Sequence, residues 1–153
     1  MDAIPKIADP DSAPLLKDAM RLVGGGVSVV TAGDGDERTG RTVTSAVSLS
    51  IDPPTTIVCV NRNASALPVI ARRRHFCVNV IAAEHEPIAN RFAGVGVGGG
   101  KGAARYEEAE WRPQATGALA AIDCEVEEMV ERHGHVIVVG AVRAVSTRRA
   151  ARL

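Results

Sequence analysis

The chain has 153 residues, 18 basic and 18 acidic side chains, and a hydrophobic content of 46%, which fits one globular domain. Zero net charge argues against a nucleic-acid-binding surface, because such a surface needs an excess of lysine and arginine. Four aromatic residues are too few for base-stacking platforms, and they make a large self-contained core harder to build, so burial against a partner subunit or a planar ligand is expected.

The sequence shows no sign of a membrane span or a secreted framework. Its apolar stretches are too short to cross a bilayer, and the N-terminus lacks the pattern of a signal peptide. Cys59, Cys77 and Cys124 are odd in number, form no Cys-x-x-Cys pair and lie in apolar strands, so they are expected in the core. A cytoplasmic protein that binds neither membrane nor nucleic acid is predicted.

The chain begins with a predicted flexible arm at residues 1–11, followed by one domain at 12–147 and a short basic tail at 148–153. Ser12 is expected to cap a first helix, because the apolar residues that follow it recur at helical spacing. The glycines at 24–26 are expected to end that helix.

The rest of the domain is rich in strands. β-Branched and alternating runs predict six strands, at 27–31, 38–51, 56–60, 76–81, 122–131 and 135–146. The turn residues at 33–36 predict a hairpin, and short helices are expected at 65–73 and 84–92. Because strands and helices do not alternate, this order favours a small antiparallel barrel over a doubly wound sheet.

The segment at 38–51 carries the most informative pattern. Alternate side chains of a strand point to opposite faces, and here one face is small and hydroxylated while the other suits a core. The small face holds Thr42, Thr44, Ala46, Ser48 and Ser50, and the other holds Val43, Ser45, Val47, Leu49 and Ile51. A small hydroxylated face lets a flat ligand such as a flavin ring approach the backbone and meet hydrogen-bond donors. A solvated strand face is the alternative.

A second candidate site follows the strand at 56–60. Ser65 is expected as the N-cap of the next helix, with Pro68 in its first turn, where a missing amide hydrogen is harmless. Free backbone amides and the positive end of the helix dipole favour a phosphate there, and Arg62 lies close in sequence. A capped helix without a ligand is the alternative.

The glycine-rich stretch is a weaker pattern. Gly94, Gly96 and Gly99 match G-x-G-x-x-G, but a helical segment precedes them and no convincing helix follows. The context of a dinucleotide-binding fingerprint is therefore missing, and a flexible loop at 94–102 is expected.

Two further groups of polar residues each have more than one interpretation. His133 and His135 could share a strand face and hold a metal, but no third ligand is near in sequence, so no metal site is predicted. They could instead be polar side chains beside a cleft. The run at 72–74 is expected to be a solvated helix end, or else to steer a nucleotide phosphate.

Several stretches, in this order, resemble the flavin reductase family with the FMN-binding split-barrel fold, which includes reductase components of two-component flavin-dependent monooxygenases. The most specific are Thr-Val-Thr-Ser at 42–45, running on to Asp-Pro-Pro at 52–54, and Val-Asn-Arg-Asn-Ala-Ser at 60–65. Further matches at 26–31, 76–81, 91–94 and 135–142 extend the resemblance over most of residues 15–145.

The resemblance implies a homodimer of six-stranded antiparallel Greek-key split β-barrels, with flavin near the subunit interface. The family's flavin-ring contacts map onto Thr42, Val43, Thr44, Ser45, Val60 and Asn61. Its phosphate and ribityl contacts map onto Ser65, Ala66, Arg91 and Phe92. His135 matches a histidine that lies near the nicotinamide, although the family's preceding aspartate is replaced here by Gly134. The chain is also shorter between 117 and 123, and it lacks the family's aromatic closing segment.

The expected function is that of an NAD(P)H:flavin oxidoreductase, which reduces FMN or FAD with NADH or NADPH and supplies reduced flavin to a separate oxygenase. The two cofactors carry the hydride chemistry, so no protein acid or base is required. Two alternatives share the fold: a flavoprotein that acts directly on a small substrate, as pyridoxamine-phosphate oxidase relatives do, and a non-catalytic dimeric flavin-binding module.

Overall fold

The computed structural model describes residues 12–94 and 118–148. The helices are α1 (Ser12–Arg21), α2 (Ala66–Arg73) and α3 (Glu86–Ala93), with 3-10 turns η1 (Gly35–Glu37) and η2 (Ala83–His85). The strands are β1 (Ser28–Ala32), β2 (Thr39–Val43), β3 (Val47–Ile51), β4 (Pro54–Asn61), β5 (His75–Val80), β6 (Ala120–Arg132) and β7 (His135–Thr147). The predicted arm at 1–11, the glycine loop after Gly94 and the tail after Arg148 lie outside the described residues.

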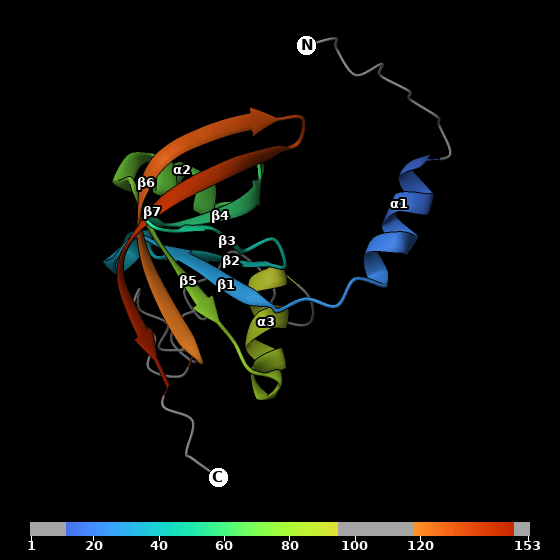
Figure 1. Ribbon diagram of the computed structural model, residues 1–153, viewed down its shortest axis with the longest axis horizontal. Coiled ribbons are helices and arrows are strands. Elements are labelled where there is room, and N and C mark those ends of the chain that lie inside the picture. Colours follow the sequence, from blue (N-terminus) through green and yellow to red (C-terminus); the bar gives the residue numbers. More distant parts are fainter. Residues whose placement is uncertain (1–11, 95–117, 149–153) are drawn as a thin grey trace.

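The strands form one sheet in the order β2-β1-β5-β6-β7-β4-β3, and every neighbouring pair is antiparallel. β6 and β7 are the longest strands and make a hairpin that runs through the middle of the sheet (Figure 1). The mainly antiparallel β fold expected from the sequence is confirmed, as are the helices at 65–73 and 84–92.

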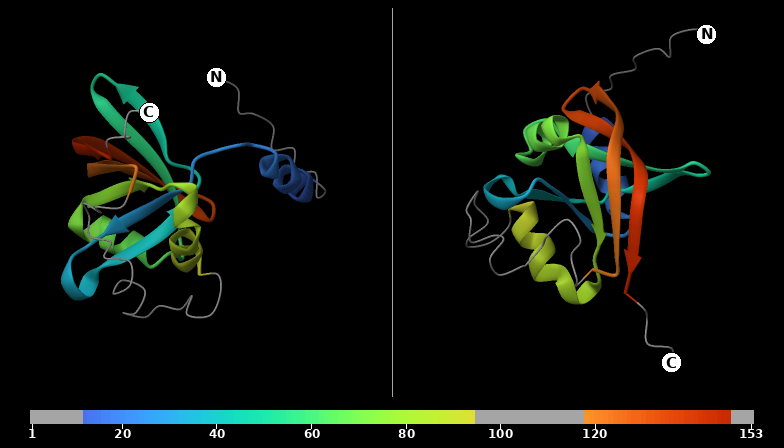
Figure 2. Two further views of the ribbon diagram at one scale, coloured as in Figure 1. Left: turned by 90° about the horizontal axis from the view of Figure 1, so that it is seen from below. Right: turned by 90° about the vertical axis from the view of Figure 1, so that its left-hand side faces the viewer.

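The sheet has seven strands, so the expectation of six is short by one. The segment at 38–51 is not one strand: β2 pairs with β1 up to Val43, and β3 pairs with β4 from Val47 onward. The three residues between them pair with neither neighbour, because the chain leaves one edge of the sheet and joins the other. The β3–β4 hairpin extends away from the side on which α2 and α3 lie (Figure 2, right).

The core lies inside the curved sheet. Val30, Val58, Phe76, Val78 and Val138 are fully or almost fully buried there, and α2 adds apolar residues that close one end. The Phe76 ring lies directly over Gly140 of β7, where an added Cβ would come within 2.5 Å of it. A larger residue cannot stand at this crossing without moving the ring.

A second, smaller core joins α3 to the sheet. Phe92 of α3 is fully buried beside Val29 of β1, and its ring covers Gly40 of β2, where an added Cβ would approach within 2.6 Å. The Thr42 hydroxyl donates a hydrogen bond of 2.6 Å to the Ala89 carbonyl in α3. These contacts cover β2 with a helix.

By contrast, α1 packs against nothing within the described residues. The helix runs from Ser12, the first described residue, to Arg21, so it ends before the glycines at 24–26 as predicted. None of its residues is buried, and its leucines and methionine are more than half exposed. Figure 1 shows it apart from the sheet. In the described ranges, no helix is long and apolar enough to cross a membrane.

Candidate ligand-binding site between β2 and β4

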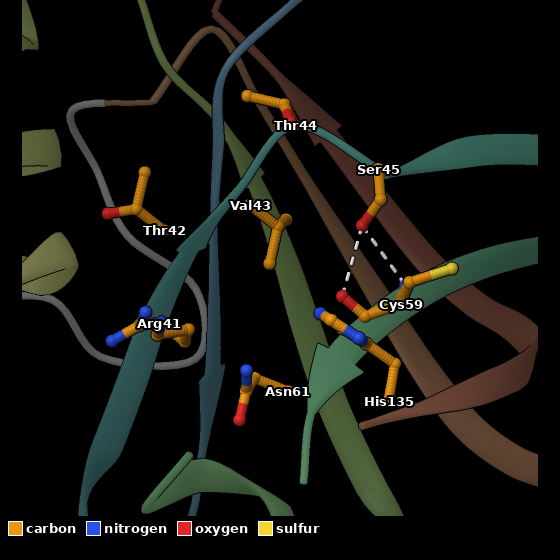
Figure 3. A pocket seen from close by; sticks show the side chains of 8 residues that line it. All are labelled: Arg41, Thr42, Val43, Thr44, Ser45, Cys59, Asn61 and His135. Carbon is orange, nitrogen blue, oxygen red and sulfur yellow. Dashed lines mark hydrogen bonds between the residues drawn. The ribbon is translucent and has the colours of Figure 1, made fainter. Parts of the chain in front are cut away.

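A pocket of about 260 Å³ lies between β2 and β4 (Figure 3). It is lined by Arg41, Thr42, Val43, Thr44, Ser45, Cys59, Asn61 and His135. These residues come from β2, from the link that follows it, from β4 and from the first position of β7. The structure therefore gathers six of the predicted site residues, from Thr42 to Ser45 with Asn61 and His135, at one place.

A side chain closes the gap between β2 and β4, which are separated by four strands in the sheet order. The Ser45 hydroxyl donates to the carbonyl of Cys59 and accepts from its backbone N–H, both at 3.1 Å. One hydroxyl thus takes the place of a strand partner for Cys59. This pair of hydrogen bonds holds the link against β4, where Ser45 and Cys59 both line the pocket.

The link carries backbone N–H groups that have no partner within the described residues. Thr44, Ser45 and Ala46 follow the last β1–β2 pair and precede the first β3–β4 pair. Within the described residues, their backbone N–H groups make no hydrogen bond. Adjacent N–H groups that lack protein partners can bind the acceptor atoms of a ligand, which is the arrangement predicted for a flat ring on this segment.

The opposite wall carries polar side chains. Asn61, at the end of β4, pairs in register with His135, at the start of β7. The Asn61 Oδ1 accepts from the backbone N–H of Asn63 at 2.8 Å, which fixes the amide and leaves its Nδ2 toward the pocket (Figure 3). His135 is exposed at the rim. Of the eight lining residues, Arg41 alone carries a permanent charge and none is a carboxylate, so the pocket favours an anionic ligand.

The other predicted site residues lie outside the lining. Val60, Ala66 and Phe92 are at most 1% exposed and belong to the core. Ser65 is exposed and precedes α2, but its side chain does not cap the helix as predicted. Its backbone is already helical, and its hydroxyl instead lies 3.1 Å from the Thr39 hydroxyl.

Arg91 is half-buried on α3, the helix that covers β2, and it does not line the pocket.

Two lining residues were not predicted. Arg41 lies on the same face of β2 as Val43, the face expected to enter the core. At Arg41, however, this face is exposed and lines the pocket. Cys59 was expected to be buried but is only half-buried. Strand alternation predicts which face of the strand each residue lies on, but it does not show that this face borders a cavity.

The two histidines near the β6–β7 turn do not form a cluster. His133 has a positive φ of 53° in the β6–β7 turn, so it does not share a strand face with His135. In the parts of the chain that the structure describes, no three metal-binding side chains gather.

The arginine run lies on the surface. Arg72 and Arg73 bond to Glu37 at 2.8 Å and 2.6 Å, and the hydrogen bond from Arg73 lowers the pKa of Glu37. Arg74 ends α2 and donates to the Val126 carbonyl. The run therefore lies at a surface helix end, as expected, and two of its arginines are paired with a carboxylate.

All three cysteines are free. Cys77 is fully buried, and burial raises its thiol pKa to about 12. Burial also raises the pKa of Cys124. These two thiols stay protonated at neutral pH, so they serve as core residues and not as nucleophiles.

The chain is similar to known proteins over almost its whole length. The profile of the flavin reductase like domain matches residues 20–153. FMN reductase (NADH) RutF 2 of Methylorubrum extorquens is 35% identical over 147 residues, which are 91% of this chain and 83% of that protein. The matched ranges include every residue that lines the pocket.

Solved structures share the fold. BorF, the flavin reductase component of a bacterial two-component tryptophan halogenase, has a TM-score of 0.79 at 26% identity, covering 90% of this chain and 89% of that one. The NADH:FAD oxidoreductase SgcE6 of Streptomyces globisporus also has a TM-score of 0.79, at 25% identity, covering 95% and 89% of the two chains.

Proposed function

The chain belongs to the flavin reductase like domain family, and we propose that it is an enzyme that uses NADH to reduce FMN or FAD and then releases the reduced flavin. The observation that carries this function is the pocket, where the link after β2 meets Asn61 and His135. Two of the relatives are named as NADH-dependent reductases of FMN or FAD, which supports the choice of substrates.

In this proposal the flavin ring would lie against Val43, the last residue of β2, and the link at 44–46. The residues there fit this ligand, because three adjacent backbone N–H groups have no partner in the part of the chain that the structure describes and the ring has nitrogen and carbonyl acceptors along one edge. Asn61 would lie beside the ring, with the buried Val60 behind it. The same N–H groups would stabilise the negative charge that reduction adds to the ring.

The ribityl and phosphate side of the flavin would extend toward the start of α2. Ser65 is an exposed polar residue there, while the buried Ala66 and Phe92 would support this side from within and Arg91 from α3. These residues would form the floor and flank of the proposed site.

NADH would bind on the open side of the ring, by His135. Hydride transfer requires the nicotinamide and flavin rings to stack in a water-poor cleft, and the chemistry resides in the two substrates. A neutral imidazole at His135 can hydrogen-bond the carboxamide and orient the nucleotide. No proton transfer by the protein is needed.

The functional unit proposed here is a homodimer. The pocket of about 260 Å³ is smaller than the roughly 300–1,000 Å³ usual for ligand sites. Val47, Leu49 and Ile51 of β3 are 58%, 56% and 82% exposed, and β3 leads directly out of the pocket wall. A second copy, related by a two-fold axis, would cover this apolar strand and deepen the pocket.

The reduced flavin would pass to a separate flavin-dependent oxygenase, as the name of the halogenase component BorF suggests for that relative. The three free cysteines support a reducing, cytoplasmic location. Residues 12–147 would form the reductase domain.

Steady-state oxidation of NADH, followed by its absorbance with and without added FMN or FAD, tests this function. NADH consumption that depends on added flavin is expected, with NADPH as a parallel donor. Flavin binding without NADH oxidation would favour a non-catalytic flavin-binding module. Failure to bind either flavin would contradict the assignment of the pocket.

A further inference from the structure

Arg41 differs from the other arginines of the described residues. Among these arginines, Arg21, Arg62, Arg72, Arg73, Arg143 and Arg148 bond to carboxylates, Arg74 and Arg132 bond to backbone carbonyls, and Arg38 and Arg91 also have partners. Arg41 bonds to no other residue of the described ranges 12–94 and 118–148, although its exposed side chain lines the pocket. An arginine without a counter-ion in a cavity free of carboxylates is a ready binding group for an anion.

The position of Arg41 on β2 indicates which anion. Its side chain shares a face with Val43, two residues further on, and with Thr39, two residues earlier. Each of these steps along the strand is about 7 Å. Thr39 in turn contacts Ser65, 3.1 Å away, at the start of α2. Arg41 therefore stands between the link that would hold the flavin ring and the exposed Ser65.

The side of the pocket opposite Arg41 is assigned to another ligand. Figure 3 shows Arg41 on β2, across the cavity from His135 on β7. The nicotinamide end of NADH is assigned to the His135 side, so a phosphate bound by Arg41 belongs to the ligand that lies along β2.

We propose that Arg41 binds the phosphate attached to the ribityl chain of the flavin, a group that FMN and FAD share and riboflavin lacks. This inference rests on the proposed function. The planar guanidinium can donate two parallel hydrogen bonds to phosphate oxygens, and the hydroxyls of Ser65 and Thr39 lie next along the same path. Arg41 would thus select phosphorylated flavins over riboflavin, while the link recognises the ring that all three have in common.

Titration of flavin fluorescence with the full-length protein tests this assignment. FMN, FAD and riboflavin are compared in the wild type, in Arg41→Gln and in Arg143→Gln, whose arginine is paired with Glu125 away from the pocket. Arg41→Gln should weaken FMN and FAD binding about tenfold or more and leave riboflavin binding unchanged. Arg143→Gln should match the wild type with all three flavins. The preference of the wild type for FMN over riboflavin should also fall as salt concentration rises.

Three results would overturn the proposal. Equal weakening of FMN and riboflavin binding in Arg41→Gln would place Arg41 against the ring. Unchanged FMN affinity with a raised KM for NADH would assign Arg41 to the nucleotide. Unchanged affinity for every ligand would leave Arg41 without a binding role. In each case flavin-dependent NADH oxidation by the wild type would still stand, so failure of this inference is distinct from failure of the proposed function.

Discussion

β2 and β3 come from one stretch of sequence that was predicted as a single strand, and both lie at an edge of the sheet. Their environments are opposite. Thr39, Gly40 and Val43 of β2 are buried, while Leu49 and Ile51 of β3 are more than half exposed. The difference arises because α3 packs on β2 through Phe92, and nothing in the described residues packs on β3. Burial of an edge strand is decided by what covers it, and the pocket forms where the covered strand ends.

Substitutions in β2, the strand that α3 covers, should reduce the stability of the protein most strongly. Gly40→Ala would place a Cβ within 2.6 Å of the Phe92 ring, so the ring or the strand must move. The free energy of unfolding should fall by about 2–3 kcal/mol, as measured by chemical denaturation. Gly134→Ala is the matched control, because nothing lies within 4 Å of its added Cβ. Equal stability of the two variants would mean that α3 does not pack firmly on β2.

At the pocket rim, His135→Ala should affect catalysis and not folding. Loss of one hydrogen bond to the nicotinamide would raise the KM for NADH and slow hydride transfer, about tenfold in kcat/KM, with flavin affinity nearly unchanged. Rapid mixing of the flavin-loaded protein with NADH measures the step. His133→Ala, in the turn, should do less. Wild-type rates in His135→Ala would leave this histidine without a role.

A substitution in the link between β2 and β3 should have an intermediate effect on stability. Ser45→Ala removes the hydroxyl that serves both the N–H and the carbonyl of Cys59, which leaves two partly buried groups without partners. A loss of about 1–2 kcal/mol is expected, together with weaker flavin binding as the pocket wall loosens. Ser48→Ala on exposed β3 should change neither property. Wild-type stability in Ser45→Ala would show that the hydroxyl does not join β2 to β4.

Substitutions in the exposed strand β3 should have little effect on the stability of a single subunit. Leu49→Lys should alter the stability of the monomer by less than about 0.5 kcal/mol, because this side chain is 56% exposed. It should weaken the proposed dimer, which sedimentation at several protein concentrations can detect, while Leu49→Ile should preserve association. If Leu49→Lys unfolds the isolated chain, then β3 faces a core and the contrast with β2 is wrong.

Local sequence determined most of the elements. β-Branched runs and turn residues predicted the strands β1, β4, β5, β6 and β7, and helical spacing predicted α2 and α3, since propensity and alternation act between near neighbours. The pattern of the 42–45 stretch also indicated where a ring could approach the backbone. Those residues, with Asn61 and His135, line the pocket.

Only the tertiary structure decided how these elements face one another. Alternation cannot show that the chain leaves β1 after Val43, because the choice of strand partner depends on residues far away in sequence. For the same reason the sequence placed Leu49 and Ile51 in the core, when they are exposed. It also assigned Arg41 to no site, because a strand face becomes a pocket wall only where the curved sheet ends and no helix covers it.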